Sequence, residues 1–142
     1  MQFATTLSNN NGPLCATLPE LRILLVEDSL PLRSRLTECL TEPGLMQVTA
    51  TAESEAQAIA HIDAQDFDIL VVDVELRPGS GINVIRHARA HWLLPPLPLI
   101  IVLTNHALPT VKARCLVAGA DHFLDKMRQF EHLYPLISQH RK

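Results

Sequence analysis

The chain has 142 residues, of which 47% are hydrophobic and 19% are charged, and its formal net charge is −3. This length and composition are typical of one folded domain and exclude a disordered or fibrous chain. Because the sequence has neither a basic excess nor a basic run, its charge gives no reason to expect nucleic acid or an anionic membrane as a partner.

Cysteine usage and hydropathy exclude further classes. Cys15, Cys39 and Cys115 are widely spaced and form no Cys-x-x-Cys pair, so the sequence predicts neither a disulfide framework nor a cysteine zinc site. The longest apolar run, residues 92–103, contains three prolines and is shorter than the roughly 20 residues of a membrane helix. The N-terminus lacks the basic and apolar regions of a secretory signal. We therefore expect a cytoplasmic protein.

Short apolar runs recur along the chain after an irregular start. Residues 1–19 show neither helical nor strand periodicity and are predicted to be a flexible extension, so the folded domain is expected to be residues 20–142. The apolar runs are residues 21–26, 47–51, 67–72, 97–103 and the weaker 122–124. Their continuous hydrophobicity is typical of strands that are buried on both faces.

Helical spacing of apolar residues separates these runs. In the first predicted helix the apolar residues are Leu32, Leu36, Cys39 and Leu40, with Ser29 as the N-cap and Pro31 in the first turn. The next three helices are marked by Ala56, Ile59 and Ile62, by Ile82, Ile85 and Ala88, and by Leu108, Val111, Cys115 and Ala118, and the last of these ends at Gly119. A fifth helix is expected within residues 128–140, where Pro135 would kink or shorten it. We expect the apolar faces of the helices to lie in the core.

Strands that alternate with helices predict a doubly wound parallel sheet, which binds ligands at the carboxyl ends of its strands. Glu27 and Asp28 follow the first predicted strand, Asp73 the third, Thr104 the fourth, and Lys126 comes shortly after the fifth. Crowded carboxylates repel one another unless a cation lies among them, and Mg²⁺ prefers carboxylate oxygens. The pattern predicts a Mg²⁺ site that faces a phosphoryl group, with Asp73 as the candidate nucleophile.

Four stretches of the sequence together resemble the response regulator receiver domain of two-component signalling. They are VED at 26–28, LVVDVELRPGSG at 70–81, IIVLTNH at 100–106 and GADHFLDK at 119–126. The resemblance covers residues 21 to roughly 140 and implies a flavodoxin-like fold, in which a five-stranded parallel sheet of order 2-1-3-4-5 carries five helices.

The resemblance also implies a role for each residue of the site. Asp73 would be the phosphoacceptor, Glu27 and Asp28 would be the acidic metal pair, and Glu75 would lend its backbone carbonyl to Mg²⁺. Thr104 and Lys126 would bind the phosphoryl group as the switch hydroxyl and the amine, and Phe123 would be the aromatic switch residue.

The chain departs from the family pattern at three places. Met127 stands where the family usually has a proline after a cis bond, and a trans bond is expected because a non-proline cis bond costs roughly 2.5–4 kcal/mol. Arg77 occupies the usual proline position of the loop after the phosphoacceptor, with Pro78 one residue later, although Gly81 keeps its spacing. Phe123 lacks the hydroxyl of a tyrosine, so we expect a weak switch.

Several histidines have two interpretations. His87 and His91, four residues apart on the third predicted helix, suit a transition metal, but the sequence offers no third ligand and an exposed helical face is favoured. His106 lies two residues after Thr104 and either tunes hydrolysis of the acyl phosphate or caps the following loop. The side chain of Glu75 is a second candidate for tuning this hydrolysis.

The resemblance leads to an expected function. Sixteen residues follow Lys126, which leaves room for one helix and predicts a stand-alone receiver. A histidine kinase or phosphotransfer protein would phosphorylate Asp73 and alter the face formed by the fourth helix, fifth strand and fifth helix. A protein partner would read that face, and a homodimer through it is a further expectation. The chain would be a phosphoacceptor rather than an enzyme, apart from self-catalysed phosphotransfer and autodephosphorylation.

Two other functions are open from the sequence. The first is a pseudo-receiver, a protein-interaction module that works without phosphorylation and keeps the acidic residues as ancestry. The second is a phosphohydrolase with an aspartyl nucleophile, which the D-x-E at Asp73 and Glu75 suggests, although its position on the third strand counts against it.

Overall fold

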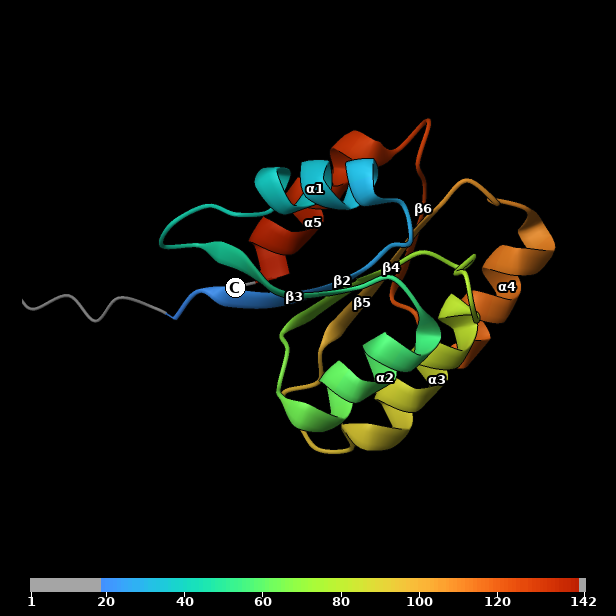
Figure 1. The fold of residues 1–142 in the computed structure, drawn as a ribbon, viewed down its shortest axis with the longest axis horizontal. Helices are drawn as coiled ribbons and strands as arrows, with labels where there is room; N and C mark the ends of the chain where they lie inside the picture. Colours follow the sequence, from blue (N-terminus) through green and yellow to red (C-terminus); the bar gives the residue numbers. More distant parts are fainter. Residues whose placement is uncertain (1–18, 141–142) are drawn as a thin grey trace, which may run out of the picture.

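The computed structural model describes residues 19–140, and these residues form a five-stranded parallel sheet between two layers of helices (Figure 1). The strands are β2 (Leu21–Val26), β3 (Met46–Ala52), β4 (Ile69–Val72), β5 (Leu99–Thr104) and β6 (His122–Asp125). The helices are α1 (Leu30–Cys39), α2 (Glu55–Ala64), α3 (Gly81–His91), α4 (Pro109–Ala118), the 3₁₀ helix η1 (Phe130–His132) and α5 (Leu133–His140). The expected extension, residues 1–19, lies outside the described residues except for Pro19.

The strand order is β3-β2-β4-β5-β6 with every neighbouring pair parallel. Numbered along the chain, this is the predicted order 2-1-3-4-5, so the predicted flavodoxin-like fold is confirmed. The register pairs Val26 with Val72, so β2 and β4 end level with each other. Val72 also pairs with Val102, and β5 continues from there to Thr104 at the same end of the sheet. The residues that follow these strands therefore meet at the carboxyl end of the sheet.

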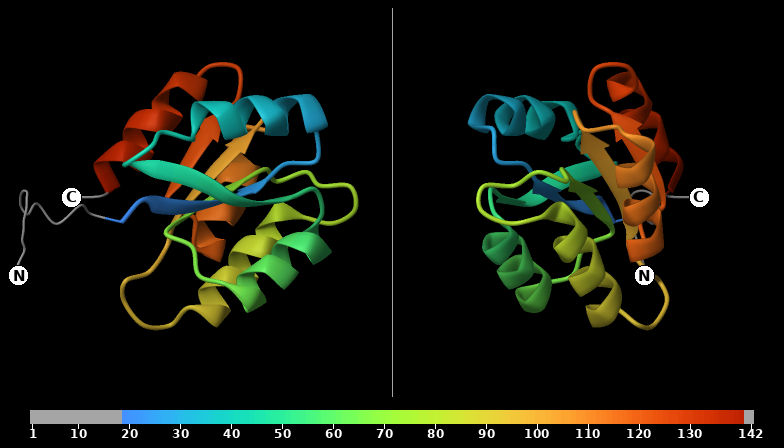
Figure 2. Two further views of the ribbon diagram at one scale, coloured as in Figure 1. Left: turned by 60° about the vertical axis from the view of Figure 1, so that its left-hand side comes forward. Right: turned by 90° about the vertical axis from the view of Figure 1, so that its right-hand side faces the viewer.

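Helices cover both faces of the sheet, with α1 and α5 on one side and α2, α3 and α4 on the other (Figures 1 and 2). Leu70 and Val72 of β4 belong to the buried cluster under α2, α3 and α4, whereas Ile69 and Val71 belong to the cluster under α1 and α5. Alternate side chains of one strand thus enter two different cores. This burial on both faces explains why the strands are continuously hydrophobic rather than alternating.

The predicted helix ends agree with the structure. The side chain of Ser29 accepts a hydrogen bond from the Leu32 amide at 3.4 Å and caps α1. Gly119 ends α4 with a φ of +121°, a backbone conformation that residues with a Cβ rarely adopt. Pro135 lies in the first turn of α5, where its missing N–H removes no helical hydrogen bond. The last α-helix accommodates the proline in its first turn and spans Leu133–His140.

Three residues expected in the core are exposed, so these expectations were wrong. On α2 the buried face is Ala58 and Ile62, while Ala56 points to solvent. Cys39 is exposed at the end of α1, and Leu108 is 60% exposed because it precedes α4 as its N-cap. Among the described residues, no helix has the length and apolar character that a bilayer span requires.

Candidate functional site

Backbone hydrogen bonds just beyond β2 and β4 position the acidic residues. The amide of Glu27 donates to the Ala52 carbonyl at 2.9 Å, and the amide of Asp73 donates to the Val26 carbonyl at 3.0 Å. Both residues thus extend the sheet by one step beyond β2 and β4, and Glu27 and Asp73 are 2% and 6% exposed. One carboxylate oxygen from each of Glu27, Asp28 and Asp73 lies within 4.8 Å of the other two. The structure therefore brings the predicted acidic residues together.

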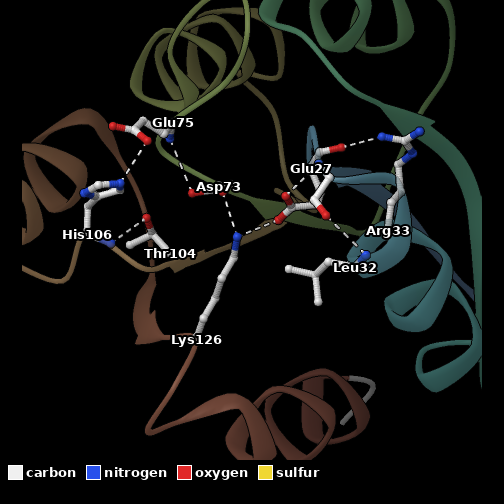
Figure 3. A network of polar contacts seen from close by, with 9 residues as sticks. Glu27, Leu32, Arg33, Asp73, Glu75, Thr104, His106 and Lys126 are labelled. Carbon is white, nitrogen blue, oxygen red and sulfur yellow. Dashed lines mark hydrogen bonds and ion pairs between the residues drawn. The ribbon is translucent and has the colours of Figure 1, made fainter.

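Lys126 lies between two of these carboxylates (Figure 3). Its Nζ is 2.8 Å from Asp73 Oδ2 and 2.8 Å from Glu27 Oε1, and the side chain is nearly buried. The backbone amide of Lys126 donates to the Thr104 carbonyl at 3.0 Å, which fixes the loop after β6 against the end of β5. The ammonium group thus offsets negative charge on both neighbours at close range.

Burial and pairing set the charge states of Glu27 and Lys126. Burial raises the pKa of Glu27, although the hydrogen bonds from Lys126 and the Ser29 amide act in the opposite direction. Burial acts to lower the pKa of Lys126, but the hydrogen bonds with Asp73 and Glu27 and the negative charges of these two groups together outweigh burial, so the net pKa is raised. Lys126 is therefore an ammonium ion at neutral pH.

Thr104 is the last residue of β5, and Phe123 lies on the neighbouring strand β6. Thr104 is fully buried, and its hydroxyl accepts a hydrogen bond from the His106 amide at 3.1 Å. Phe123 is half-buried on β6 and packs against the core cluster under α2, α3 and α4. The hydroxyl oxygen of Thr104 thus accepts a hydrogen bond from the backbone of the following loop.

Glu75 and His106 contact each other at the rim of the site (Figure 3). His106 Nε2 lies 2.9 Å from Glu75 Oε1, and the side chains are 49% and 60% exposed. The Glu75 amide also donates to Asp73 Oδ1 at 3.3 Å, which ties the loop after β4 to the acidic cluster. The sequence singled out both residues for the same role, but their direct contact was not predicted because they are far apart in the chain.

These residues surround an open cavity of about 620 Å³. Its lining includes Glu27, Asp28, Asp73, Glu75, His106 and Lys126, but Thr104 and Phe123 do not line it. A space of this size with clustered carboxylate oxygens accommodates a hydrated divalent cation beside a phosphoryl group. The donor set is all oxygen, which fits Mg²⁺ and not a softer metal.

Arg33 supports the acidic site from α1, a role that the sequence did not indicate. One guanidinium nitrogen donates to the Glu27 carbonyl at 2.8 Å (Figure 3). Another guanidinium nitrogen lies 3.6 Å from Glu53 Oε2. Arg33 thereby holds the turn that carries the acidic pair against α1. No motif marks this residue, and its six-residue separation from Glu27 becomes meaningful only once the turn is folded.

The loop after Asp73 is anchored from α2. Glu55 Oε1 accepts hydrogen bonds from the Ser80 amide at 2.9 Å and from Asn83 Nδ2 at 3.2 Å.

Among the described residues, the cis peptide bonds are Arg77–Pro78 and Pro95–Pro96. The bond between Lys126 and Met127 is therefore trans, as expected from the missing proline.

The fold and the site together define a class of protein. Residues 23–138 match the family model of the response regulator receiver domain. The chain belongs to this family, whose members are phosphoacceptor domains of two-component signalling and bind Mg²⁺ at an acidic site. The family predicted from the sequence is confirmed.

Curated relatives of the chain are larger proteins. It is 30% identical to the transcriptional regulatory protein TcrA of Mycobacterium tuberculosis, over 94% of this chain and 52% of that protein. It is also 30% identical to the phosphate regulon transcriptional regulatory protein PhoB of Escherichia coli, over 74% of this chain and 44% of that protein. The chain thus spans about half the length of these relatives.

Solved structures share the fold. A LuxR-family DNA-binding response regulator from Staphylococcus aureus superposes with a TM-score of 0.76 at 20% identity, over 86% of this chain and 99% of that one. The receiver domain of the putative response regulator NarL from Mycobacterium tuberculosis has a TM-score of 0.74 at 22% identity, with 86% and 97% coverage. These likenesses establish the fold alone.

Proposed function

We propose that Asp73 accepts a phosphoryl group from a histidine kinase or a phosphotransfer protein in a Mg²⁺-dependent reaction. The convergence of Glu27, Asp28, Asp73 and Lys126 on one cavity supports this proposal, since these residues come from three separate strand ends. A similar response regulator from Burkholderia pseudomallei, 23% identical, was crystallised with a phosphorylated aspartic acid. In this chain the nearly buried Asp73 is the matching candidate.

In the proposed reaction, an Asp73 oxygen attacks phosphorus. A new P–O bond forms as the bond from phosphorus to the donor breaks, and the donor leaves with that electron pair. Glu27, Asp28 and Asp73, with the backbone carbonyl of Glu75, would hold Mg²⁺, which supplies positive charge to the phosphoryl oxygens. Lys126 would stabilise another phosphoryl oxygen from the opposite side.

Phosphorylation would be passed on by Thr104 and Phe123. The Thr104 hydroxyl would leave the His106 amide and donate to a phosphoryl oxygen, and Phe123 would move into the space that this change opens. Both residues lie on the strands next to α4, so the change would reach the surface formed by α4, β6 and α5.

That surface carries exposed apolar side chains that suit a protein partner. Val117 is 88% exposed on α4, Met127 is 85% exposed after β6, and Tyr134 is 38% exposed on α5. We propose that a downstream protein or a second copy of the chain binds here, without direct contact to nucleic acid or membrane. We further propose that residues 20–142 form the folded unit and that the chain acts as a stand-alone receiver in the cytoplasm. We also propose that it is a phosphoacceptor rather than an enzyme.

The test is modification of Asp73 by a small acyl phosphate with Mg²⁺, followed by intact-protein mass. One phosphoryl group should be added to the wild-type chain, none to Asp73→Asn, and little when EDTA replaces Mg²⁺. Asp66→Asn is the matched control, because an asparagine there still accepts the hydrogen bond from Trp92 Nε1. No modification of the wild type would contradict the proposal and favour the phosphorylation-independent module. Rapid turnover of phosphate esters would favour the hydrolase instead.

The contact between Glu75 and His106 is expected to lengthen the life of the acyl phosphate. The pair lies at the mouth of the cavity, where it restricts the approach of water to phosphorus. Glu75→Ala and His106→Ala should each shorten the lifetime by about two- to tenfold, and the double variant should do no more than either single change. Dephosphorylation timed after removal of the phosphodonor measures this. Unchanged lifetimes, or additive effects in the double variant, would contradict it.

A further inference from the structure

A second group of potential metal ligands joins α2 to α3. Asp63 lies near the end of α2, and His87 and His91 lie on the last turns of α3. His87 Nε2 is 2.7 Å from Asp63 Oδ1, and His91 Nδ1 is 3.5 Å from the same oxygen. The sequence indicated only the histidine pair. The structure supplies the third ligand from the neighbouring helix.

This group is separate from the acidic cavity. Both α2 and α3 begin at the carboxyl ends of the strands, where Asp73 lies, and run back toward the amino ends of the strands (Figure 1). Asp63, His87 and His91 lie at the far ends of these helices, and the lining of the acidic cavity contains none of them. A ligand bound here would not compete for the phosphoacceptor.

We propose that Asp63, His87 and His91 bind a divalent transition metal ion of the zinc class. In a tetrahedral site with bonds of about 2.0–2.1 Å, ligand atoms lie about 3.3–3.4 Å apart. The 3.5 Å separation of His91 Nδ1 and Asp63 Oδ1 already fits this geometry. The hydrogen-bonded 2.7 Å contact of His87 has to open by less than 1 Å. Solvent completes the fourth position, because all three side chains are partly exposed.

The ligand types select the metal. Two imidazoles with one carboxylate suit Zn²⁺, Ni²⁺ or Cu²⁺, whereas Mg²⁺ prefers an all-oxygen set with several waters. Two neutral imidazoles with one carboxylate are a ligand set that holds Zn²⁺ with a solvent molecule in the fourth position. The Glu27, Asp28 and Asp73 cluster offers only carboxylate oxygens, so the two sites should prefer different metal ions.

The surroundings of His91 hold its ring in place. The Trp92 ring meets the His91 ring edge-on with centroids 5.1 Å apart, and the His87 and His91 rings are nearly parallel at 16°. Trp92 itself packs on the Phe67 ring and donates from Nε1 to Asp66 at 3.2 Å. This packing limits the rotamers of His91, so little ordering is needed when the metal binds.

A metal bound at this site would cross-link two helices that cover the same face of the sheet. Because the unfolded chain does not hold these ligands together, the ion would bind the folded state preferentially and raise the melting temperature. This inference does not depend on phosphorylation of Asp73.

The chain contains one tryptophan, Trp92, which reports directly on the site. The experiment uses the full chain without an affinity tag, in excess Mg²⁺, with Ni²⁺ quenching of Trp92 fluorescence and calorimetric titration with Zn²⁺. We expect saturable quenching, one Zn²⁺ bound per chain at this site, and a higher melting temperature. Asp63→Asn, His87→Ala and His91→Ala should each weaken binding by at least about tenfold.

The matched control is His132→Ala, which removes an exposed histidine on η1 and should leave the affinity within about twofold. Circular dichroism checks that each variant is folded, and the titration midpoint rather than the starting fluorescence is compared. The proposal is overturned if no saturable quenching occurs at millimolar Ni²⁺, or if His87→Ala binds as tightly as the wild type. Binding that is lost in Asp28→Asn but kept in His87→Ala would place the ion in the acidic cavity and would equally overturn it.

Discussion

Lys126→Met is expected to lower the free energy of unfolding at neutral pH by about 1–3 kcal/mol, because it leaves two nearly buried carboxylates without their shared donor. The same change should slow Mg²⁺-dependent phosphorylation of Asp73 by up to about 100-fold, since one positive charge facing the phosphoryl oxygens is lost. Urea unfolding and the rate of modification by an acyl phosphate measure the two effects. Saturating Mg²⁺ should restore part of the lost stability by offsetting the unpaired negative charge of the two carboxylates.

The destabilisation should also depend on pH. Burial raises the pKa of Glu27, so its protonated form is favoured in the folded state. The stability that comes from this protonation is present below the unfolded pKa and is lost as pH rises through the folded one. Without Lys126 the folded pKa of Glu27 rises further, and the variant should therefore be closer to wild-type stability at pH 5 than at pH 7.

Lys112→Met is the matched control, because Lys112 is exposed on α4 and lines no part of the cavity. It should change stability by less than about 0.5 kcal/mol and leave the rate of phosphorylation unaltered. Equal stability of Lys126→Met and the wild type at neutral pH would mean that Lys126 does not compensate the carboxylates.

Gly81→Ala is expected to destabilise the chain by about 3 kcal/mol, the upper end for overpacking. A Cβ at Gly81 would lie 2.0 Å from the Asp73 carbonyl oxygen and 2.9 Å from Val72 Cγ1. Neither the end of β4 nor the start of α3 can move away without displacing the phosphoacceptor. Thermal unfolding measures the loss of stability, and the rate of phosphorylation should fall with it.

Gly44→Ala separates this clash from a general cost of replacing glycine. A Cβ at Gly44 would meet no atom within 4 Å, and its φ of +84° gives only a backbone penalty of about 1–2 kcal/mol. If Gly81→Ala were no more destabilising than Gly44→Ala, the close packing of α3 against Asp73 would be wrong.

The sheet and the acidic cluster could be predicted because each follows from local sequence. Strands buried on both faces are continuously apolar, and their carboxyl ends share one edge, so residues after β2, β4 and β6 had to meet. The amphipathic faces were less certain, as Ala56 shows. Alanine occurs at both buried and exposed helical positions, so its presence does not show which face of a helix is buried. The orientation of α2 on the sheet buries Ala58 and leaves Ala56 exposed.

The contacts that could not be predicted join residues whose separation in the sequence carries no signal. Asp63 reaches His87 only because α2 and α3 pack side by side, and Glu75 reaches His106 only because two loops meet above the sheet. The hydroxyl of Thr104 illustrates a different limit. The sequence placed it at the correct strand end, but its hydrogen bond to the His106 amide depends on loop conformation.

A crystal structure of the chain with Mg²⁺ and beryllium fluoride would test the convergence of these side chains most directly. We expect a beryllofluoride group on an Asp73 carboxylate oxygen, with Lys126 Nζ on one fluorine and the cation held by Asp28 and Asp73. A crystal grown under saturating conditions in which Asp73 stays unmodified, or in which the cation binds away from Asp28, would contradict it.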